Sequence, residues 1–315
     1  MTQPPGAWLA VAGTSDEQFV DRLWRLVLRR DVEPEARADA LARLQAGLSR
    51  SGLLHELATS AEFAHVRALD DGVAFAAAAR RAGERPRNLT APVGTDERPV
   101  EIPWVLSRYA GEARVLDAGY AFAEPAYLAG LTGLGAAVTG VDLVVADVPG
   151  ITSVQADLRR LPFPRGAFDL AIAISTLEHV GRDNTQYGLA AEDDDAALGD
   201  ALAGLRRALS RSGRLLVTVP AGAGERLPEQ VVLEPRVWVE RFEAAGFVVW
   251  EDELYELGAE GWRSVSSLTP GLAYGARGPG ASAVLCAELR PRGVTTRMRL
   301  AVRDRRFPDD PRRAT

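Results

Sequence analysis

Hydrophobic positions in the first quarter of the chain recur with the spacing of amphipathic helices. A first helix is expected from Asp16, and one of its faces carries Phe19, Leu23, Leu26 and Val27. Two further apolar stripes follow in "EPEARADALARLQAGLSR" and "SGLLHELATSAEFAHVRAL", the first with Pro34 in its first turn, where proline is tolerated. The pattern predicts a small, all-helical accessory domain over residues 1–85.

The hydrophobic pattern changes after residue 100. Short apolar, β-type runs now alternate with helical segments, in the order "ARVLDA", "AAVTGVDL", "TSVQADL", "FDLAIAIS", "GRLLVTVP", "FVVWEDELYE" and "ASAVLCAELR". Such alternation predicts an α/β domain with a mainly parallel, doubly wound sheet over residues 101–290. Only Leu143 to Ile151 separate the second strand from the third, so at least one crossover helix is small or missing.

Two segments lack any regular hydrophobic period. The stretch "GERPRNLTAPVGTDERP" is rich in proline, glycine and polar residues, which predicts a linker over residues 86–100. Residues 291–315 form an arginine-rich tail. We expect a solvated terminus there, with contact to an acidic partner or a lipid surface as the alternative.

Composition limits the classes of function. The 315 residues are 47% hydrophobic and 25% charged, as in globular proteins. The net charge of -6 argues against nucleic-acid binding, which needs a basic surface, and no apolar run approaches the roughly 20 residues of a membrane span. Cys286 is the only cysteine, which excludes a disulfide framework. We expect a cytoplasmic protein without a metal site or an integral membrane segment.

Three aspartates stand at the ends of successive predicted strands. Asp117 ends the first, Asp142 the second and Asp157 the third. Ligands of doubly wound sheets bind outside the carboxyl ends of the strands, so these side chains are expected to line one cleft. Asp142 follows Asp117 by 25 residues, near the place where an acidic side chain usually binds ribose hydroxyls. Asp157, together with the amide of Leu158, suits the polar edge of an adenine.

The loop after the first strand carries a single glycine where nucleotide-binding loops carry several. Gly119 is present, but Ala121 and Ala123 stand in place of the second and third glycines. A pyrophosphate needs close approach of several backbone amides, so this loop suits a ligand without phosphate. The alternative is a loop that only connects strand to helix.

These segments resemble the class I S-adenosylmethionine-dependent methyltransferases over about residues 101–290. "FDLAIAIS…LEHV" is similar to the fourth strand and the following turn of that family, and "LRRALSRSGRLLVTVP" to its next helix, glycine turn and fifth strand. "GYAFAEPAYL" and "STLEHVGRDNTQYG" look most like members encoded among bacterial glycan and surface-polysaccharide genes. The resemblance implies a Rossmann-like, seven-stranded sheet and S-adenosyl-L-methionine as cofactor. It places the cofactor at Asp117, Gly119, Tyr120, Ala121, Asp142, Leu143, Asp157, Leu158 and Ser175.

The turn after the fourth strand supplies the candidates for a catalytic base. His179 is the first choice because histidine titrates near neutrality, and its neighbour Glu178 is the second. An aliphatic hydroxyl acceptor has a high pKa and benefits from such a base. The alternative role for His179 is to pack on the cofactor or to orient a loop. Asp183, Asn184, Gln186 and Tyr187 are expected to form the acceptor pocket or a lid. Trp262, Arg263 and Tyr274 are further candidates for contact with the acceptor, with packing in the core as the alternative for the two aromatic residues.

The remaining polar residues receive structural interpretations. Asp193 to Asp195 are interpreted as the charged start of a helix. His55 and His65 are expected to pack or to lie at the surface. The N-terminal helices resemble a short helical domain of unknown function, distantly like phycobilisome linkers, which implies docking to a protein partner or self-association.

The sequence as a whole predicts an S-adenosylmethionine-dependent methyltransferase. Its acceptor is expected to be a carbohydrate or another small hydroxylated molecule, methylated on oxygen. Two alternatives stay open. One is a scaffold protein that keeps the fold without turnover. The other is a nicotinamide-dependent oxidoreductase, whose pyrophosphate fits the glycine-poor loop less well.

Overall fold

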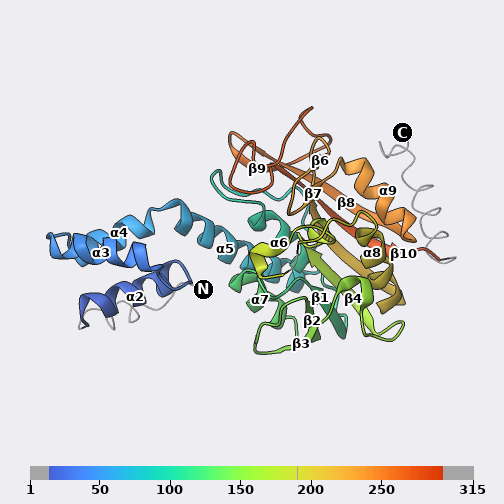
Figure 1. The fold of residues 1–315 in the computed structure, drawn as a ribbon, viewed down its shortest axis with the longest axis horizontal. Coiled ribbons are helices and arrows are strands. Elements are labelled where there is room, and N and C mark those ends of the chain that lie inside the picture. Colours follow the sequence, from blue (N-terminus) through green and yellow to red (C-terminus); the bar gives the residue numbers. More distant parts are fainter. Residues whose placement is uncertain (1–13, 190, 294–315) are drawn as a thin grey trace.

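A mixed sheet of eight strands forms the centre of the protein in the computed structural model, which describes residues 14–189 and 191–293 (Figure 1). The strands lie in the order β3-β2-β1-β4-β5-β10-β8-β9. Their bounds are β1 (Arg114–Ala118), β2 (Ala137–Asp142), β3 (Ile151–Gln155), β4 (Phe168–Ile174), β5 (Leu209–Pro220), β8 (Phe247–Gly258), β9 (Gly261–Val265) and β10 (Ala283–Pro291). A separate hairpin consists of β6 (Glu225–Arg226) and β7 (Val231–Val232).

The strand order explains where a ligand can bind. Strands β3, β2, β1, β4 and β5 are parallel, and β10 runs antiparallel between β5 and β8. The chain winds one way from β1 to β3 and the other way from β4 onward, so the switch point lies between β1 and β4. The predicted α/β class and all seven predicted strands are present. The eighth strand, β9, was not predicted, and it extends the sheet by pairing with β8.

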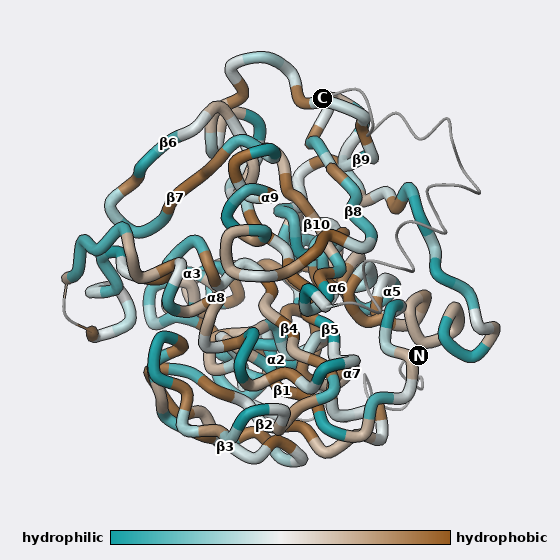
Figure 2. The backbone as a smooth tube through the Cα atoms, turned by 90° about the vertical axis from the view of Figure 1, so that its right-hand side faces the viewer, coloured by the Kyte–Doolittle hydropathy of each residue, from teal (hydrophilic) through white to brown (hydrophobic). Residues whose placement is uncertain are grey.

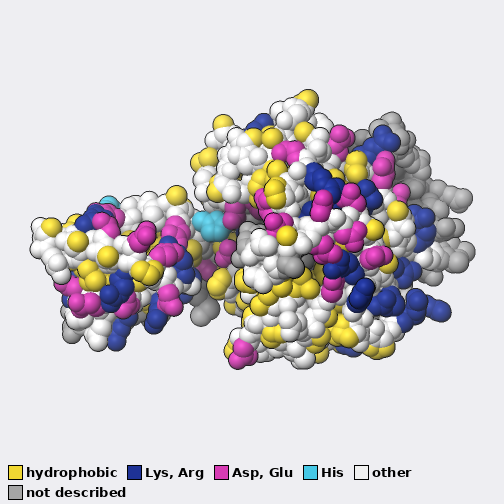
Figure 3. All heavy atoms as spheres, in the orientation of Figure 1, with side chains coloured by type: hydrophobic (Ala, Val, Ile, Leu, Met, Phe, Trp, Pro, Cys, Tyr) yellow, Lys and Arg dark blue, Asp and Glu magenta, His cyan; other side chains and the backbone are white. Residues whose placement is uncertain are grey.

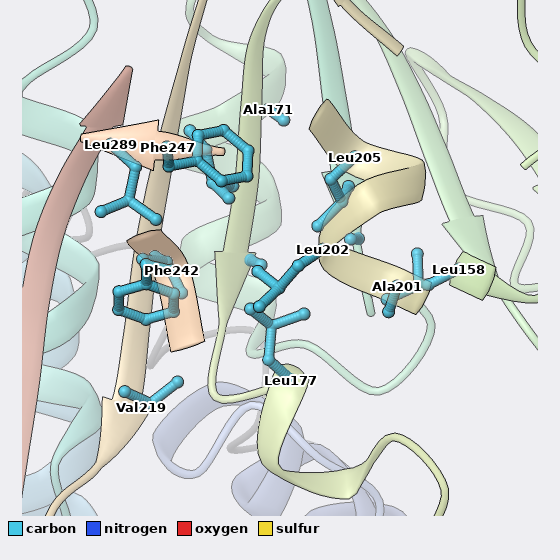
Figure 4. Packing of buried hydrophobic residues seen from close by; sticks show 14 of the residues in the cluster. Leu158, Ala171, Leu177, Ala201, Leu202, Leu205, Val219, Phe242, Phe247 and Leu289 are labelled. Carbon is cyan, nitrogen blue, oxygen red and sulfur yellow. The ribbon is translucent and has the colours of Figure 1, made fainter. Parts of the chain in front are cut away.

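Helices cover both faces of the sheet. One face packs against α8 (Ala197–Ala208) and α9 (Pro235–Ala244), and the other against α6 (Arg98–Ser107) and α7 (Pro125–Thr132). Figure 4 shows leucines of α8 and Phe242 of α9 directed toward the strands. Leu202 and Leu205 are fully buried there, and burial of a leucine contributes about 1.5–3 kcal/mol. The two layers hold the strand ends in fixed positions.

Three short helices form an arm that projects from the sheet (Figure 1). They are α2 (Asp16–Val27), α3 (Pro34–Gln45) and α4 (Arg50–Ala58), and serine hydroxyls cap the first turns of α2 and α4. Of the predicted apolar face of α2, Phe19, Leu23 and Val27 are buried and Leu26 is half-buried. His55 is exposed on α4. The arm has its own apolar core, as the pattern predicted.

The long helix α5 (Ala61–Ala82) joins the arm to the sheet, and it lies wholly within the predicted accessory domain of residues 1–85. Phe63, in its first turn, packs against the core of the arm, whereas Leu69 and Ala76 belong to the core beside the sheet. Further along, Arg80 Nη1 donates a hydrogen bond of 2.9 Å to the carbonyl of Leu106 in α6. Most of α5 is therefore part of the sheet region.

The predicted linker over residues 86–100 packs against the sheet. Arg87 Nε donates to Glu253 Oε1 at 2.8 Å, Leu89 is buried, and Ala91 forms an antiparallel bridge with Trp262 of β9. The end of the segment enters α6 at Arg98. Proline and glycine here shape an extended strap along the sheet edge, and they do not produce a free linker. Of the predicted tail, residues 294–315 lie outside the described part of the chain.

Apolar residues concentrate in the interior of the sheet. In Figure 2 hydrophobic segments run through the central strands, and hydrophilic segments predominate in the outer loops. Within residues 14–189 and 191–293, none of the helices combines the length and the hydropathy that a bilayer crossing requires.

Candidate active site

A cavity of about 350 Å³ opens at the carboxyl ends of β1 to β4. Asp117, Asp142 and Asp157 all line it, together with Gly119. Leu143, Leu158 and Ser175 are also part of its wall. The structure therefore brings the three predicted aspartates around one cleft, at the switch point of the sheet.

Asp117 lies at the floor of this cavity, and one of its oxygens is unpaired. The Tyr127 hydroxyl donates to Oδ1 at 2.7 Å, while Oδ2 is buried and has no hydrogen-bond partner among the described residues. Burial raises the pKa of Asp117 to about 7, and the nearby charge of Asp142 acts in the same direction. A ligand group with a positive charge and a hydrogen to donate would satisfy this oxygen and lower the pKa.

Gly119 cannot be replaced without strain. Its φ is +86°, a left-handed conformation, and a Cβ at this position would lie 2.3 Å from Thr176 Oγ1. The Thr176 hydroxyl is itself held by donating to the carbonyl of Ala118 at 3.0 Å. The one glycine of the loop is thus required by its own backbone and by the turn after β4.

Tyr120 and Ala121, which the family resemblance placed at the cofactor, do not line the cavity. Tyr120 is buried beneath Gly140, and its hydroxyl donates to the carbonyl of Ala146 at 2.9 Å, so it supports the loop after β2. The amide of Ala121 donates to Asp142 Oδ2 at 3.1 Å. Both residues support the site from behind, and the chain returns to the cavity wall at Phe122.

Asp142 is fixed by backbone amides and keeps accepting capacity. Oδ1 accepts from the amide of Leu143 at 2.7 Å, and Oδ2 accepts from Ala121. Oδ1 also accepts from the amide of Val144 at 3.4 Å, so the free lone pair is on Oδ2. The side chain is half-buried at the cavity, and Leu143 forms the exposed rim beside it. This arrangement suits a ligand hydroxyl.

Asp157 is already bound by an arginine. The Arg159 amide donates to Oδ1 at 2.8 Å, and Arg159 Nη2 donates to Oδ2 at 2.6 Å. Burial alone would raise the pKa of Asp157, but these hydrogen bonds outweigh it and hold the pKa below its ordinary value. Arg159 also pairs with Glu192 across the cavity. The sequence prediction treated Asp157 as free and missed this partner, although Arg159 stands only two positions further along.

Ser175 adopts a strained conformation at the end of β4. Its φ is +41°, which is uncommon for a residue with a side chain. The hydroxyl donates to Glu101 Oε1 at 2.9 Å, and the amide donates to the carbonyl of Thr218 at 3.0 Å. These bonds hold the strain, as is frequent at ligand sites.

His179 has the protonation state that a base requires. Nδ1 lies 2.7 Å from the carbonyl of Glu229, which can only accept, so Nδ1 carries the hydrogen and Nε2 keeps its lone pair. Burial, the largest influence, lowers the pKa of His179 below its ordinary value, so the ring is neutral at pH 7. The ring borders both this cavity and a second one beside it.

Glu178 is unsuited to the role of base. The side chain is buried, and Oε2 has no hydrogen-bond partner within the part of the chain that the structure describes. Burial raises the pKa of Glu178 well above its ordinary value, and the charge of Glu101 adds to this. Burial therefore opposes the ionised form that a base requires, which weakens Glu178 as the second candidate.

The second cavity has a volume of about 250 Å³ and adjoins the first. Arg98, Ser175, His179 and Tyr187 border both. The side chains that border the second cavity alone are mostly polar and include Glu97, Glu178, Glu229, Gln230 and Tyr274. Arg98, Glu97 and Gln230 were not predicted from the sequence, because they come from the presumed linker and from the β6–β7 hairpin.

The predicted acceptor residues divide between these cavities and other places. Asn184 and Tyr187 line the first cavity, and Tyr274 lines the second. Tyr187 also packs on Phe122, with ring centroids 4.7 Å apart. Of the others, Asp183, Trp262 and Arg263 do not line either cavity. Asp183 accepts from the amide of Thr185, and Trp262 is buried in the core, where its indole donates to the carbonyl of Thr95. Arg263 is exposed, and the side chain of Gln186 is outside the described residues.

The acidic run does not start a helix, because α8 begins only at Ala197. Asp193 and Asp195 instead bind the buried Arg182, at 2.7 and 2.5 Å, and both also bind Arg226 of β6. On the face shown in Figure 3 acidic and basic side chains lie side by side in this way. Among the described residues, no group of three or more candidate metal ligands is found.

With this geometry established, comparison with known families gives two matches. Residues 116–217 match a methyltransferase domain. This segment runs from β1 into β5 and contains most of the residues around the first cavity. It agrees with the resemblance found in the sequence, and it indicates S-adenosyl-L-methionine as the cofactor. Residues 8–66 match a domain of unknown function, which covers the helical arm. A comparison with curated proteins finds no match.

Several solved structures are similar in fold. The 1,6-didemethyltoxoflavin N1-methyltransferase of Burkholderia thailandensis, solved with S-adenosylhomocysteine, is 18% identical, with 84% of this chain and 92% of that chain covered and a TM-score of 0.41. The [4+2]-cyclase SpnF is 17% identical, with 75% and 97% covered and a TM-score of 0.44. A TehB-like S-adenosylmethionine-dependent methyltransferase of Corynebacterium glutamicum is 20% identical, with 61% and 87% covered and a TM-score of 0.38.

Proposed function

We propose that this protein transfers the methyl group of S-adenosyl-L-methionine to a hydroxyl of a small polar acceptor, a carbohydrate in the first place. One observation carries the proposal: a neutral histidine, His179, stands between a cavity that suits the cofactor and a second, polar cavity. The match to a methyltransferase domain supports the cofactor. The polar lining of the second cavity supports a hydroxylated acceptor.

The charges around the first cavity favour a cationic ligand. Six acidic side chains line it, against two arginines; the acids are Asp96, Asp117, Glu124, Asp142, Asp157 and Glu192. Such a surplus attracts a sulfonium and an ammonium group and repels a pyrophosphate. It therefore argues against a nicotinamide dinucleotide, the weaker alternative from the sequence.

The residues present fit the cofactor group by group. The unpaired Oδ2 of Asp117 would accept from its ammonium group, and Asp142 from its ribose hydroxyls. Leu158 and the Asp157–Arg159 pair form the wall where the adenine would lie. When bound, the cofactor supplies an electrophilic methyl group.

His179 would receive the proton of the acceptor hydroxyl at Nε2. The hydrogen bond from Nδ1 to Glu229 fixes the ring in the orientation for this step. A well-placed general base contributes about 10²–10⁴-fold, whereas alignment of the reactants contributes about 7–11 kcal/mol. Positioning by the cavity walls is thus the larger share, and His179 adds the proton transfer.

The other parts of the proposal concern location and partners. The projecting arm α2 to α4 suits docking to a protein partner or self-association. The likeness of two loop motifs to methyltransferases from glycan gene clusters supports a carbohydrate acceptor and a cytoplasmic enzyme.

A methyl-transfer assay tests the proposal. Protein with isotope-labelled S-adenosyl-L-methionine and a panel of monosaccharides and other small alcohols is expected to release S-adenosylhomocysteine and to label an oxygen. Labelling on nitrogen or carbon alone would contradict the O-directed part. Cofactor binding without transfer to any acceptor would favour a scaffold that keeps the fold.

A further inference from the structure

The second cavity holds more carboxyl groups than its cations can neutralise. Glu97, Glu178 and Glu229 line it, and Glu101 lies directly behind. Arg98 is the one arginine in its wall, and Nη1 of that residue already donates to Glu101 Oε2 at 2.7 Å. The surplus acids face a cavity that shares His179 with the first cavity.

Two buried side chains here lack hydrogen-bond partners. Glu178 is 2% exposed and Gln230 is 4% exposed, yet Glu178 Oε2 and Gln230 Nε2 have no partner among the described residues. Leaving a buried polar atom unpaired costs about 1–3 kcal/mol. Glu178 Oε2 suits a hydrogen-bond donor of a ligand, and Gln230 Nε2 suits an acceptor.

Burial favours the protonated forms of two of the carboxyls when no ligand is bound. It raises the pKa of Glu97 to about 7 and the pKa of Glu178 well above its ordinary value. A cation in the cavity would favour the charged forms and release their protons. A carboxylate-bearing ligand would meet the opposite effect and would be repelled.

We propose that the acceptor is an amino alcohol, in which an ammonium group binds Glu178 and Glu97 while a neighbouring hydroxyl faces His179. Gln230 donates to a further oxygen of the same molecule. An amino sugar has this arrangement of groups. The inference rests on the proposed function, because it assumes that His179 receives the hydroxyl proton. What it adds is that the acceptor carries a positive charge.

Two matched probes test the ammonium site. Serinol (2-amino-1,3-propanediol) and glycerol differ only in the central group, which is an ammonium in one and a hydroxyl in the other. Both are titrated into protein saturated with S-adenosylhomocysteine, in phosphate at pH 7, and binding is followed by NMR shifts of the protein. Serinol is expected to bind about tenfold more tightly or better, because its hydrogen bonds are charge-assisted.

Two variants with the same change locate the effect. Glu178→Gln keeps the size of the side chain but cannot ionise, and it is expected to abolish the preference for serinol. Glu260→Gln, at an exposed position of the β8–β9 turn, is expected to leave it intact. Unchanged affinity of Glu178→Gln for S-adenosylhomocysteine shows that the variant is folded and that the first cavity is intact.

Proton release supplies a second readout, which a purely structural role of Glu178 would not produce. Serinol binding in weakly buffered solution is expected to release protons, and glycerol binding is not. Equal binding of the two probes, no binding of either, or a serinol preference that survives in Glu178→Gln would overturn the inference and leave cofactor binding untouched. Failure of the unaltered protein to bind S-adenosylhomocysteine would instead overturn the proposed function, and the inference with it.

Discussion

The two cavities are built from carboxyl groups in different ways. In the first, Asp117, Asp142 and Asp157 each lie at or just beyond the carboxyl end of a parallel strand, and the latter two are held by amides or by an arginine of their own loop. In the second, Glu97 and Glu178 come from segments about 80 residues apart, and burial raises the pKa of both. The comparison teaches that strand ends bring carboxyl groups together by rule, whereas loops do so only through packing. In both cavities burial makes the charge of some carboxyls depend on the ligand, Asp117 in the first and Glu97 and Glu178 in the second.

His179 stands between the cavities, so its removal gives the largest expected effect. Replacement by Ala is expected to lower the rate of methyl transfer by about 10²–10⁴-fold, because the acceptor hydroxyl loses its base. Affinity for S-adenosylhomocysteine, measured by calorimetry, is expected to stay within about twofold. An unchanged rate would show that His179 only packs beside the cofactor.

The first cavity depends on the backbone at Gly119. A comparison of Gly119 with Gly135 separates the cost of the left-handed backbone from the cost of the contact with Thr176. Gly135 also has a positive φ, but a Cβ there would meet nothing within 4 Å. Gly135→Ala is expected to lower the free energy of unfolding by about 1–2 kcal/mol through conformation alone. Gly119→Ala, which adds the clash with Thr176, is expected to cost more and to weaken cofactor binding. If denaturant unfolding gives the same loss of stability for both variants, the contact with Thr176 does not contribute to the cost at Gly119.

Asp117 makes the stability of the free protein depend on pH. Its pKa is about 7 when folded and near 3.9 when unfolded, so between these values the folded state binds more protons. The contribution of Asp117 to stability therefore falls as pH rises from about 4 to about 7. Asp117→Asn is expected to flatten this fall by about 1 kcal/mol or more between pH 5 and 7 in denaturant titrations.

Glu97 and Glu178 are present both in the unaltered protein and in Asp117→Asn. The difference between the two pH profiles of stability therefore isolates the contribution of Asp117. Identical pH profiles would show that the Asp117 carboxyl is already ionised in the folded state. Saturation with S-adenosylhomocysteine is expected to reduce the difference, because its ammonium group lowers the pKa of Asp117.

The sequence predicted the first cavity better than the second for a physical reason. Parallel strands alternating with helices place their carboxyl ends together, so one pattern located three aspartates. The second cavity has no such rule, since Arg98 stood in a presumed linker and Gln230 in a hairpin of two-residue strands. Strand β9 was missed because it is a short edge strand with a mixed pattern.

Local hydrogen bonds caused the other differences. Tyr120 follows the turn at Gly119 but points into the core, where its hydroxyl donates to the carbonyl of Ala146. Asp193 and Asp195 satisfy a buried arginine that lies more than ten positions earlier. Neither Ala146 as the partner of Tyr120 nor Arg182 as the partner of the aspartates can be recognised from the spacing of residues in the sequence. Both pairings form only when the loops have packed on the sheet.

The central claim is that the aspartates at the strand ends hold S-adenosyl-L-methionine, and Asp142 tests it most directly. Calorimetric titration with S-adenosylhomocysteine is expected to give micromolar affinity for the unaltered protein and a loss of about tenfold or more for Asp142→Ala, which removes charged acceptors for the ribose hydroxyls. Equal affinity in the two proteins would contradict the account.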